Sequence, residues 1–386
     1  MGWDRQAPKV VEAPEPPVLG RWVLAAVMTL LVCVLLFLLH ASGRMPLLQV
    51  LNIWVFSGLP LLVWTLAFAA RAHVYGGALS RYQFLEEEAQ GAQQSWQGWA
   101  QRYLAVSASC VLLPDQVSAS VLAQGPSGLP PRPGQARRIA ALPVQADRAQ
   151  AGLQILLPAL APGLQTLPSG QELRVTVLSD ANPEQYEALR DALRQSWTIA
   201  MSRPLPAMVT LAGELSYEWI DETLKTASAS IELILVVQVH GEGAYSDGLA
   251  ALLLCPDSLA RALTLPVTAG LSRPMPLDID ALDTDFPLFL QTQASACQAT
   301  GLLADDASWQ PLTSKMLAVA GAHGASLEVE QQWIQESQCG LPGPFGHWLV
   351  TALGVEMVRH QRRPLLVLAR EDSGHWISTV TTGELA

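Results

Sequence analysis

The sequence has few charged residues, and they are not clustered into patches. Only 15% of its 386 residues are charged, and the 23 Lys and Arg are spread along the chain without a basic stripe. The formal net charge is −11 at pH 7. Nucleic acid and anionic lipid surfaces require clustered Lys and Arg, so this distribution argues against electrostatic binding to phosphates.

Cysteine and histidine are also scarce and scattered. The five cysteines show no CxxC spacing, and the seven histidines show no HxH or HExxH pattern. The sequence therefore predicts neither a disulfide framework nor a zinc site, and no metal or cofactor is expected. The cysteines are interpreted as free thiols in a reducing compartment, one of them inside an apolar run: Cys33, Cys110, Cys255, Cys297 and Cys339.

Two long uncharged runs lie near the N-terminus. The first, residues 22–39 (WVLAAVMTLLVCVLLFLL), would form a helix of roughly 27 Å, close to the thickness of a bilayer core. The second covers residues 46–70, and only the short turn 41–45 separates the two. A turn of this length makes the two helices antiparallel neighbours. The pattern predicts a transmembrane hairpin over residues 21–71.

Lys and Arg near the ends of these runs set the expected orientation. Arg5, Lys9 and Arg21 precede the first run, and Arg71 and Arg81 follow the second. The connecting turn has only Arg44. Both termini are therefore expected in the cytoplasm. One alternative is a signal peptide, but the first run exceeds the usual h-region and no A-x-A-like cleavage site follows it. The other is burial of both helices in a soluble core.

The flanking segments predict little compact structure. Residues 1–20 are rich in proline and small polar side chains, which indicates a disordered leader. Residues 72–135 form a membrane-proximal segment, with a helix expected over 76–103, a strand over 103–114 and a Pro- and Gly-rich loop over 124–135.

Residues 136–386 show the alternation of an α/β domain in two halves, about 136–270 and 271–386. The section 136–167 is ambiguous. Each half then ends in a helix, an apolar strand, a turn and another strand, which indicates an internal duplication. A strand that is apolar on both faces, IELILVVQVH, indicates a sheet covered on both sides. The predicted strands are 173–178, 206–211, 231–240, 249–255, 364–369 and 376–381, and the predicted helices are 183–200, 217–229 and 346–360.

Ser246 is one candidate nucleophile. The sequence AYSDG (244–248) imitates a nucleophile elbow with Ala in place of the first Gly. Such an elbow requires a sharp turn from a strand directly into a helix, and here a strand is expected to follow. A glycine-rich hairpin tip is the favoured interpretation.

Two further motifs have structural and functional interpretations. The segment LDIDALDTDF carries four acids at close spacing that could hold calcium: Asp278, Asp280, Asp283 and Asp285. The Gly that a calcium loop requires between the acids is missing, which favours a polar loop around a short extended segment. A carboxylate-lined recognition surface is the second choice. CGLPGPFG (339–346) precedes a helix, and its backbone N–H groups could bind an anion. We favour close helix-on-sheet packing as the role of these glycines.

The C-terminal half resembles the thiolase-like fold of thiolases and ketoacyl synthases. GPFGHWLVTALGVEMV followed by RPLLVLARED is similar to the family's core helix and last strands, and ILVVQVHGEGAYSDGLAALLLC to the end of its first half. The resemblance implies a nucleophilic Cys at a helix N-terminus, with His residues or a second Cys beside it. Cys297, in SACQA, follows the first-half hairpin and is therefore out of order for the family's nucleophile. The His that the family has before its core helix would fall near residues 339–341, where there is none. An acyl-transfer enzyme would rely on Cys297 or Cys339 with His323 or His347, but these departures favour the fold without the reaction.

The chain also resembles a bacterial family of unknown function that includes the type VI lipase adapter, through its membrane-proximal N-terminus, thiolase-like body and GPFGHWL region. The resemblance implies a non-catalytic adapter, anchored at the inner membrane by two passes with the large domain in the cytoplasm. Its implied partners are a lipase effector and the spike protein of the secretion machine. The alternatives are an acyl-transfer enzyme at the inner membrane and an immunity-type inhibitor. No catalytic, cofactor-binding or metal-binding residue is assigned.

Overall fold

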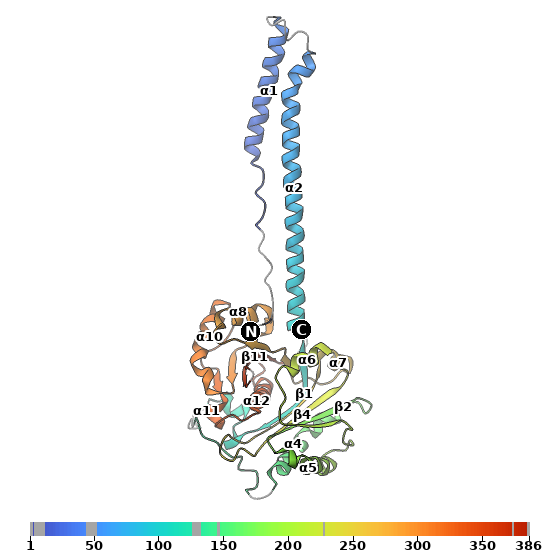
Figure 1. Ribbon diagram of the computed structural model, residues 1–386, viewed down its shortest axis with the longest axis vertical. Coiled ribbons are helices and arrows are strands. Elements are labelled where there is room, and N and C mark those ends of the chain that lie inside the picture. Colours follow the sequence, from blue (N-terminus) through green and yellow to red (C-terminus); the bar gives the residue numbers. More distant parts are fainter. Residues whose placement is uncertain are drawn as a thin grey trace. The chain divides into compact units, whose positions relative to one another are not determined.

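The computed structural model describes Trp3 and residues 12–43, 52–125, 133–144, 147–226, 228–372 and 374–383 (Figure 1). The chain divides into two compact units. One consists of Gln6–Ser95, and the other, called the body below, consists of Met1–Arg5 and Trp96–Ala386.

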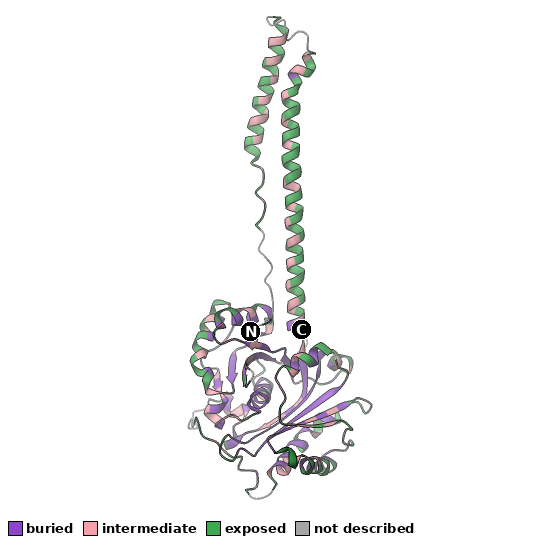
Figure 2. Cartoon of the chain, viewed as in Figure 1, coloured by how far each residue is buried: buried purple, intermediate pink, exposed green. Residues whose placement is uncertain are grey.

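Two helices are long and apolar enough to cross a membrane. They are α1 (Leu19–Ala41), with a mean hydropathy of 2.9, and α2 (Ile53–Ala100), whose most apolar window reaches 1.9. Most of their side chains are exposed or half-buried, which suits a lipid environment better than a soluble core (Figure 2). The helix predicted over 76–103 is not separate, because α2 runs unbroken from the second apolar run to Ala100.

The body contains strands from both halves of the sequence and short helices between them. The strands are β1 (Tyr103–Leu112), β2 (Leu173–Ser179), β3 (Val209–Ala212), β4 (Ile231–Gln238), β5 (Gly248–Pro256), β6 (Ala269–Ser272), β7 (Met275–Leu277), β8 (Gly301–Ala304), β9 (Gln332–Ile334), β10 (Leu365–Glu371) and β11 (Gly374–Thr381).

The helices of the body, after the end of α2, are η1 (Pro114–Gln116), α3 (Ala119–Ala123), α4 (Arg148–Gln165), η3 (Pro183–Gln185), α5 (Tyr186–Ala200), α6 (Trp219–Thr226), α7 (Asp257–Ala262), α8 (Leu282–Thr292), α9 (Ala294–Cys297), η4 (Ala307–Trp309), α10 (Gln310–Ala322), α11 (Gln335–Cys339) and α12 (Gly346–Gln361).

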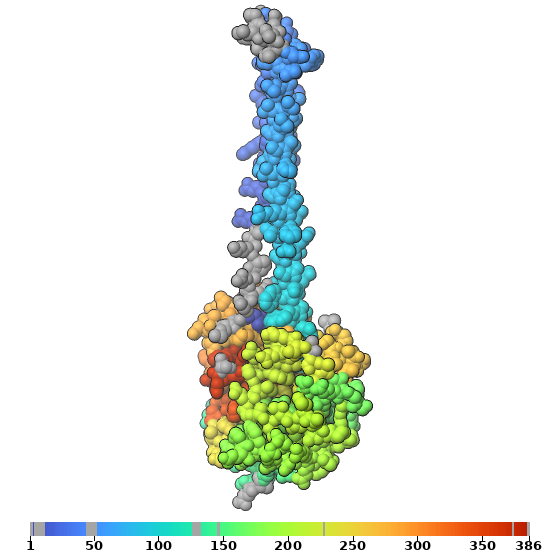
Figure 3. Space-filling view, turned by 45° about the vertical axis from the view of Figure 1, so that its right-hand side comes forward, coloured from blue at the N-terminus to red at the C-terminus, as the bar shows by residue number. Residues whose placement is uncertain are grey.

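The sheet repeats one strand order twice. The first half has the order β3-β2-β4-β5-β1 and the second half has β9-β8-β10-β11-β6. In each half the first three strands are parallel and the fourth is antiparallel to its neighbours. β1 pairs with β6 and joins the halves, which lie side by side in the space-filling view (Figure 3). The duplicated α/β body predicted from the sequence is confirmed.

Alternating side chains of the strands face different helices. In β4, Leu233 and Leu235 pack with α4 and α5, whereas Ile234 and Val236 share a cluster with α6 and α12. Val367 of β10 belongs to that same cluster, while its neighbours on the strand pack with α8 and α10. α6 and α12 therefore form a central layer that receives side chains from both halves of the sheet.

Several local predictions need correction. The ambiguous section 136–167 contains α4, whose apolar face is buried despite Pro158 and Pro162. The strand expected over 206–211 begins only at Val209. The acidic segment after β7 is not extended throughout, because Asp283 and Asp285 lie in the first turn of α8.

Candidate functional site

A cleft opens where the central helices α6 and α12 begin. Its volume is about 520 Å³, and loops that end strands of both halves line it. Gly213–Ser216 connects β3 to α6, Pro342–Gly346 leads into α12, and Asp305 follows β8. The turn between β10 and β11 and the side chain of Tyr245 complete the lining. Carboxyl ends of parallel strands are where α/β proteins commonly bind ligands.

The cleft is acidic. Five carboxylates line it against one Arg side chain, and they are Glu214, Asp305, Asp306, Glu371 and Asp372, with Arg370 as the cation. Among the described residues no group of three or more His, Cys, Asp or Glu side chains is placed to hold a metal ion. An excess of carboxylates attracts cationic groups.

Two of the acids serve the structure as well as the surface. Glu371 accepts hydrogen bonds from Ser216 Oγ at 3.2 Å and from the Tyr217 backbone N–H, which holds the start of α6 against the β10–β11 turn. Asp305 is buried, and accepts from the Arg370 N–H at 2.7 Å and from Trp309 Nε1 at 3.0 Å. Burial raises the pKa of Asp305 to about 7.

His347, at the start of α12, lines the cleft together with residues of the glycine motif. Its Nε2 lies 3.0 Å from the Leu215 carbonyl oxygen and 3.4 Å from Glu371 Oε1. Burial lowers the pKa of His347, outweighing the opposite effect of Glu371. A neutral imidazole that donates to a carbonyl has a positioning role in the fold.

Aromatic side chains fill the space beneath the cleft, between the two central helices. Tyr217 is fully buried, and its hydroxyl lies 2.8 Å from Ser378 Oγ and 3.0 Å from Thr351 Oγ1. The ring centroid of Trp348 lies 5.9 Å away, at an edge-to-face angle. Side chains therefore pack closely between α6 and α12.

The candidate thiols do not reach the cleft. Cys339 in α11 is buried, which raises its pKa to about 12, and Cys297 in α9 donates to the Leu290 carbonyl at 3.3 Å. Burial also raises the pKa of Cys297, whereas a nucleophilic thiol requires a lowered one. His323 ends α10, with Nδ1 3.0 Å from the Val319 oxygen. No cysteine of the described residues is in the lining.

Ser246 and the glycine motif are structural. Ser246 Oγ accepts from the Arg137 N–H at 3.1 Å, and β5 follows rather than a helix, so the hairpin interpretation holds. In the glycine motif, a Cβ on Gly343 would lie 2.5 Å from the Gln238 side chain, and Gly340 has φ +85°. The close packing expected at these glycines is confirmed, but their neighbours are the end of β4 and loop residues, so it is not α12 lying on the sheet that requires them.

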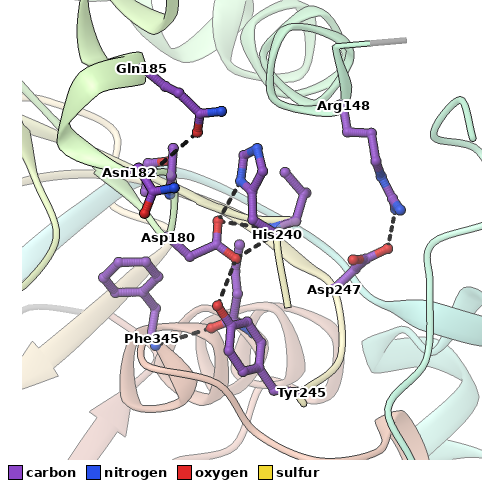
Figure 4. A network of polar contacts seen from close by, with 12 residues as sticks. Arg148, Asp180, Asn182, Gln185, His240, Tyr245, Asp247 and Phe345 are labelled. Atoms are coloured by element: carbon purple, nitrogen blue, oxygen red, sulfur yellow. Dashed lines mark hydrogen bonds and ion pairs between the residues drawn. The ribbon is translucent and has the colours of Figure 1, made fainter. Parts of the chain in front are cut away.

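A second polar network, which the sequence reasoning missed, lies behind Tyr245 (Figure 4). Asp180 follows β2 and accepts from the N–H groups of Val239 and His240 at 3.1 and 2.7 Å. It also lies 3.0 Å from His240 Nδ1 and accepts from the Tyr245 hydroxyl at 3.2 Å. The position of Asp180 just after the predicted strand 173–178 was the feature of the sequence that could have indicated this network. The network fixes the β4–β5 turn and thereby one wall of the cleft.

Asp180→Asn is expected to lower the pKa of His240. In the native chain the hydrogen bond with Asp180 raises that pKa above 6.5, against the opposing effect of burial. The stability that this pair contributes is therefore fully present below the pKa that His240 has in the unfolded chain, and it is lost as pH rises through the pKa that His240 has in the folded chain. NMR titration of carbon-13-labelled histidine, assigned with His240→Gln, measures the shift. An unchanged His240 titration in the variant would contradict this account.

Comparison with known proteins adds fold relatives only. No family model and no curated protein matches the chain. A type II polyketide ketosynthase with its acyl-carrier protein is 9% identical, covers 73% of this chain and 99% of its own, with a TM-score of 0.48. The ishigamide ketosynthase/chain length factor is 12% identical, and the match covers 72% of this chain and 99% of that chain with a TM-score of 0.48.

A third similar structure is the 3-oxoacyl-[acyl-carrier-protein] synthase III from Aquifex aeolicus VF5, which is 8% identical and covers 72% of this chain and 99% of its own, with a TM-score of 0.41. The body repeats one strand order in its two halves. Similarity at this level says nothing about activity.

Proposed function

We propose that this chain is a membrane-anchored, non-catalytic adapter that binds a lipase effector of type VI secretion and delivers it to the spike. One observation carries the non-catalytic part. The cleft between the central helices has no thiol in its described lining, and Tyr217 and Trp348 pack against each other beside it. A cleft without a cysteine in its described lining supports a binding role over thiol-based acyl transfer.

The anchor supports the location. α1 and α2 both qualify as membrane spans, and Trp3, which precedes α1, and Trp96, in the last part of α2, belong to the same compact unit. A chain that leaves the body and returns to it must cross a bilayer an even number of times. Together with the Lys and Arg at the outer ends of the runs, this favours a two-pass protein of the bacterial inner membrane, with both termini and the body in the cytoplasm.

The cleft is the proposed contact surface for the effector. Its excess of carboxylates would attract Lys or Arg side chains of a partner, and charge complementarity of this kind increases association rate and specificity. Confinement to a membrane surface raises the effective concentration of a partner assembled there. No covalent step is involved in this role.

Charge reversal in the cleft is expected to weaken capture of the effector by about tenfold or more, roughly 1.4 kcal/mol. The variant is Glu214→Lys with Asp372→Lys, both exposed residues of the lining. The control is Glu184→Lys with Glu330→Lys, which changes the net charge equally at exposed positions outside the cleft lining. Full-length protein in detergent is immobilised and challenged with the lipase encoded in the same genome. Equal capture by both variants would remove the cleft from the proposal.

A further inference from the structure

Trp3 is buried in the body although it stands almost at the chain's beginning. Only 9% of it is exposed, and its ring centroid lies 5.2 Å from that of Trp99 and 5.7 Å from that of Phe289. Its Nε1–H donates to the Pro274 carbonyl oxygen at 3.2 Å. Buried indoles usually find such an acceptor. Both the apolar ring and the polar atom of this side chain are therefore satisfied by the body.

The walls of this indole socket are fixed by contacts that do not involve Trp3. The guanidinium of Arg273 lies 4.1 Å from the ring centroid of Trp99, and its Nε donates to the Trp99 carbonyl at 3.2 Å. Arg273 is 2% exposed and pairs with Asp221 of α6. A stacked and paired Arg of this kind holds the last turn of α2 against the body.

The socket also extends beyond the space that Trp3 fills. A cavity of about 270 Å³ lies beside the indole, lined in part by Trp96, Pro276 and Trp376. Aromatic and proline side chains around a cavity provide a large apolar contact area with little loss of conformational entropy. The site thus has the composition of a recognition surface for an aromatic segment.

We propose that the socket is a binding site for a tryptophan-bearing segment and that its ligand is the chain's own N-terminal tail. Trp3 and Pro274 are 271 positions apart in sequence, and α1 and the apolar part of α2 lie between Trp3 and Trp99. Docking of Trp3 therefore closes a loop that contains the complete anchor. Tethering keeps the local concentration of the tail high enough for a single side chain to stay bound. This inference does not depend on the identity of any effector.

A photo-crosslinking benzophenone amino acid at position 3 tests the contact directly. The full-length chain is irradiated in membranes, digested and analysed by mass spectrometry. We expect crosslinks within one chain, to peptides that contain Pro274 or Phe289. Crosslinks between two chains would overturn the assignment in favour of an exchanged tail. An absence of crosslinks to the body would overturn it altogether.

Proteolysis provides a second readout. Trypsin can cleave after Arg5, two residues from the docked side chain. In detergent-solubilised protein, Trp3→Ala is expected to raise the rate of this cleavage at least tenfold, and Trp3→Phe, which keeps a ring without the N–H donor, to give an intermediate rate. Trp54→Ala, at a 74% exposed position of α2, is the control and should leave the rate unchanged. Equally fast cleavage of the native chain and Trp3→Ala would overturn the proposal.

Discussion

Gly340→Ala is expected to lower the free energy of unfolding by about 3 kcal/mol or more, a large part of the roughly 5–15 kcal/mol that is typical of native proteins. Gly340 has φ +85°, a region that L side chains rarely adopt. An added Cβ would overlap the Gln135 carbonyl oxygen and lie 2.5 Å from Ser246 Oγ. Both neighbours are held by their own hydrogen bonds, so neither can move away without cost.

The matched control for this change is Gly321→Ala. Gly321 lies in α10, at an exposed position where an added Cβ would meet nothing within 4 Å. Because Ala is the better helix former, this variant should gain about 0.5–1 kcal/mol. Thermal and denaturant unfolding, followed by tryptophan fluorescence, compares the two. A Gly340→Ala chain as stable as the native protein would contradict the packing role of the glycine motif.

Asp305→Asn is expected to remove much of the pH dependence of stability between about pH 4 and 7. The pKa of Asp305 is near 3.8 when unfolded and about 7 when folded, so the folded chain binds a proton that the unfolded chain has released. Stability from this residue therefore falls as pH rises through that window. The full difference corresponds to roughly 4 kcal/mol, because one pKa unit is about 1.36 kcal/mol.

The decisive readout is the slope against pH rather than the stability at one pH. An amide at position 305 places an NH₂ group toward one of the donors that Asp305 now accepts from, which costs stability at every pH. Unfolding in urea at pH 5 and pH 7 should show the native chain losing roughly 2–3 kcal/mol more than the variant. Parallel slopes for the two proteins would show that Asp305 stays ionised in the folded state.

The elements that could be predicted from the sequence are those with strong local patterns. β4 is largely apolar on both faces, and α12 follows a glycine motif, so both were predicted close to their bounds. β8 and β9 have four and three residues and give no periodic signal. The continuity of α2 was hidden because its pattern changes from apolar to polar at Arg71.

The cleft and the socket depend on contacts between distant segments. Asp305 and Glu371 follow or end different strands, and only the parallel pairing of β8 with β10 brings their loops together. Trp3 has no local signal at all, since its acceptor and ring partners come from residues 99, 274 and 289. Such long-range juxtapositions are set by the tertiary fold, which a pattern of one or two turns does not encode.

The central claim is that the body acts by binding and not through a reactive thiol. Delivery of the lipase effector in a strain that lacks this chain tests it most directly, with complementation by the native chain and by Cys297→Ser combined with Cys339→Ala. We predict that deletion abolishes delivery and that both chains restore it to the same level. The account would be contradicted if the native chain restored delivery and the double cysteine variant did not, and if mass spectrometry found an acyl group on Cys297 or Cys339 of the native chain.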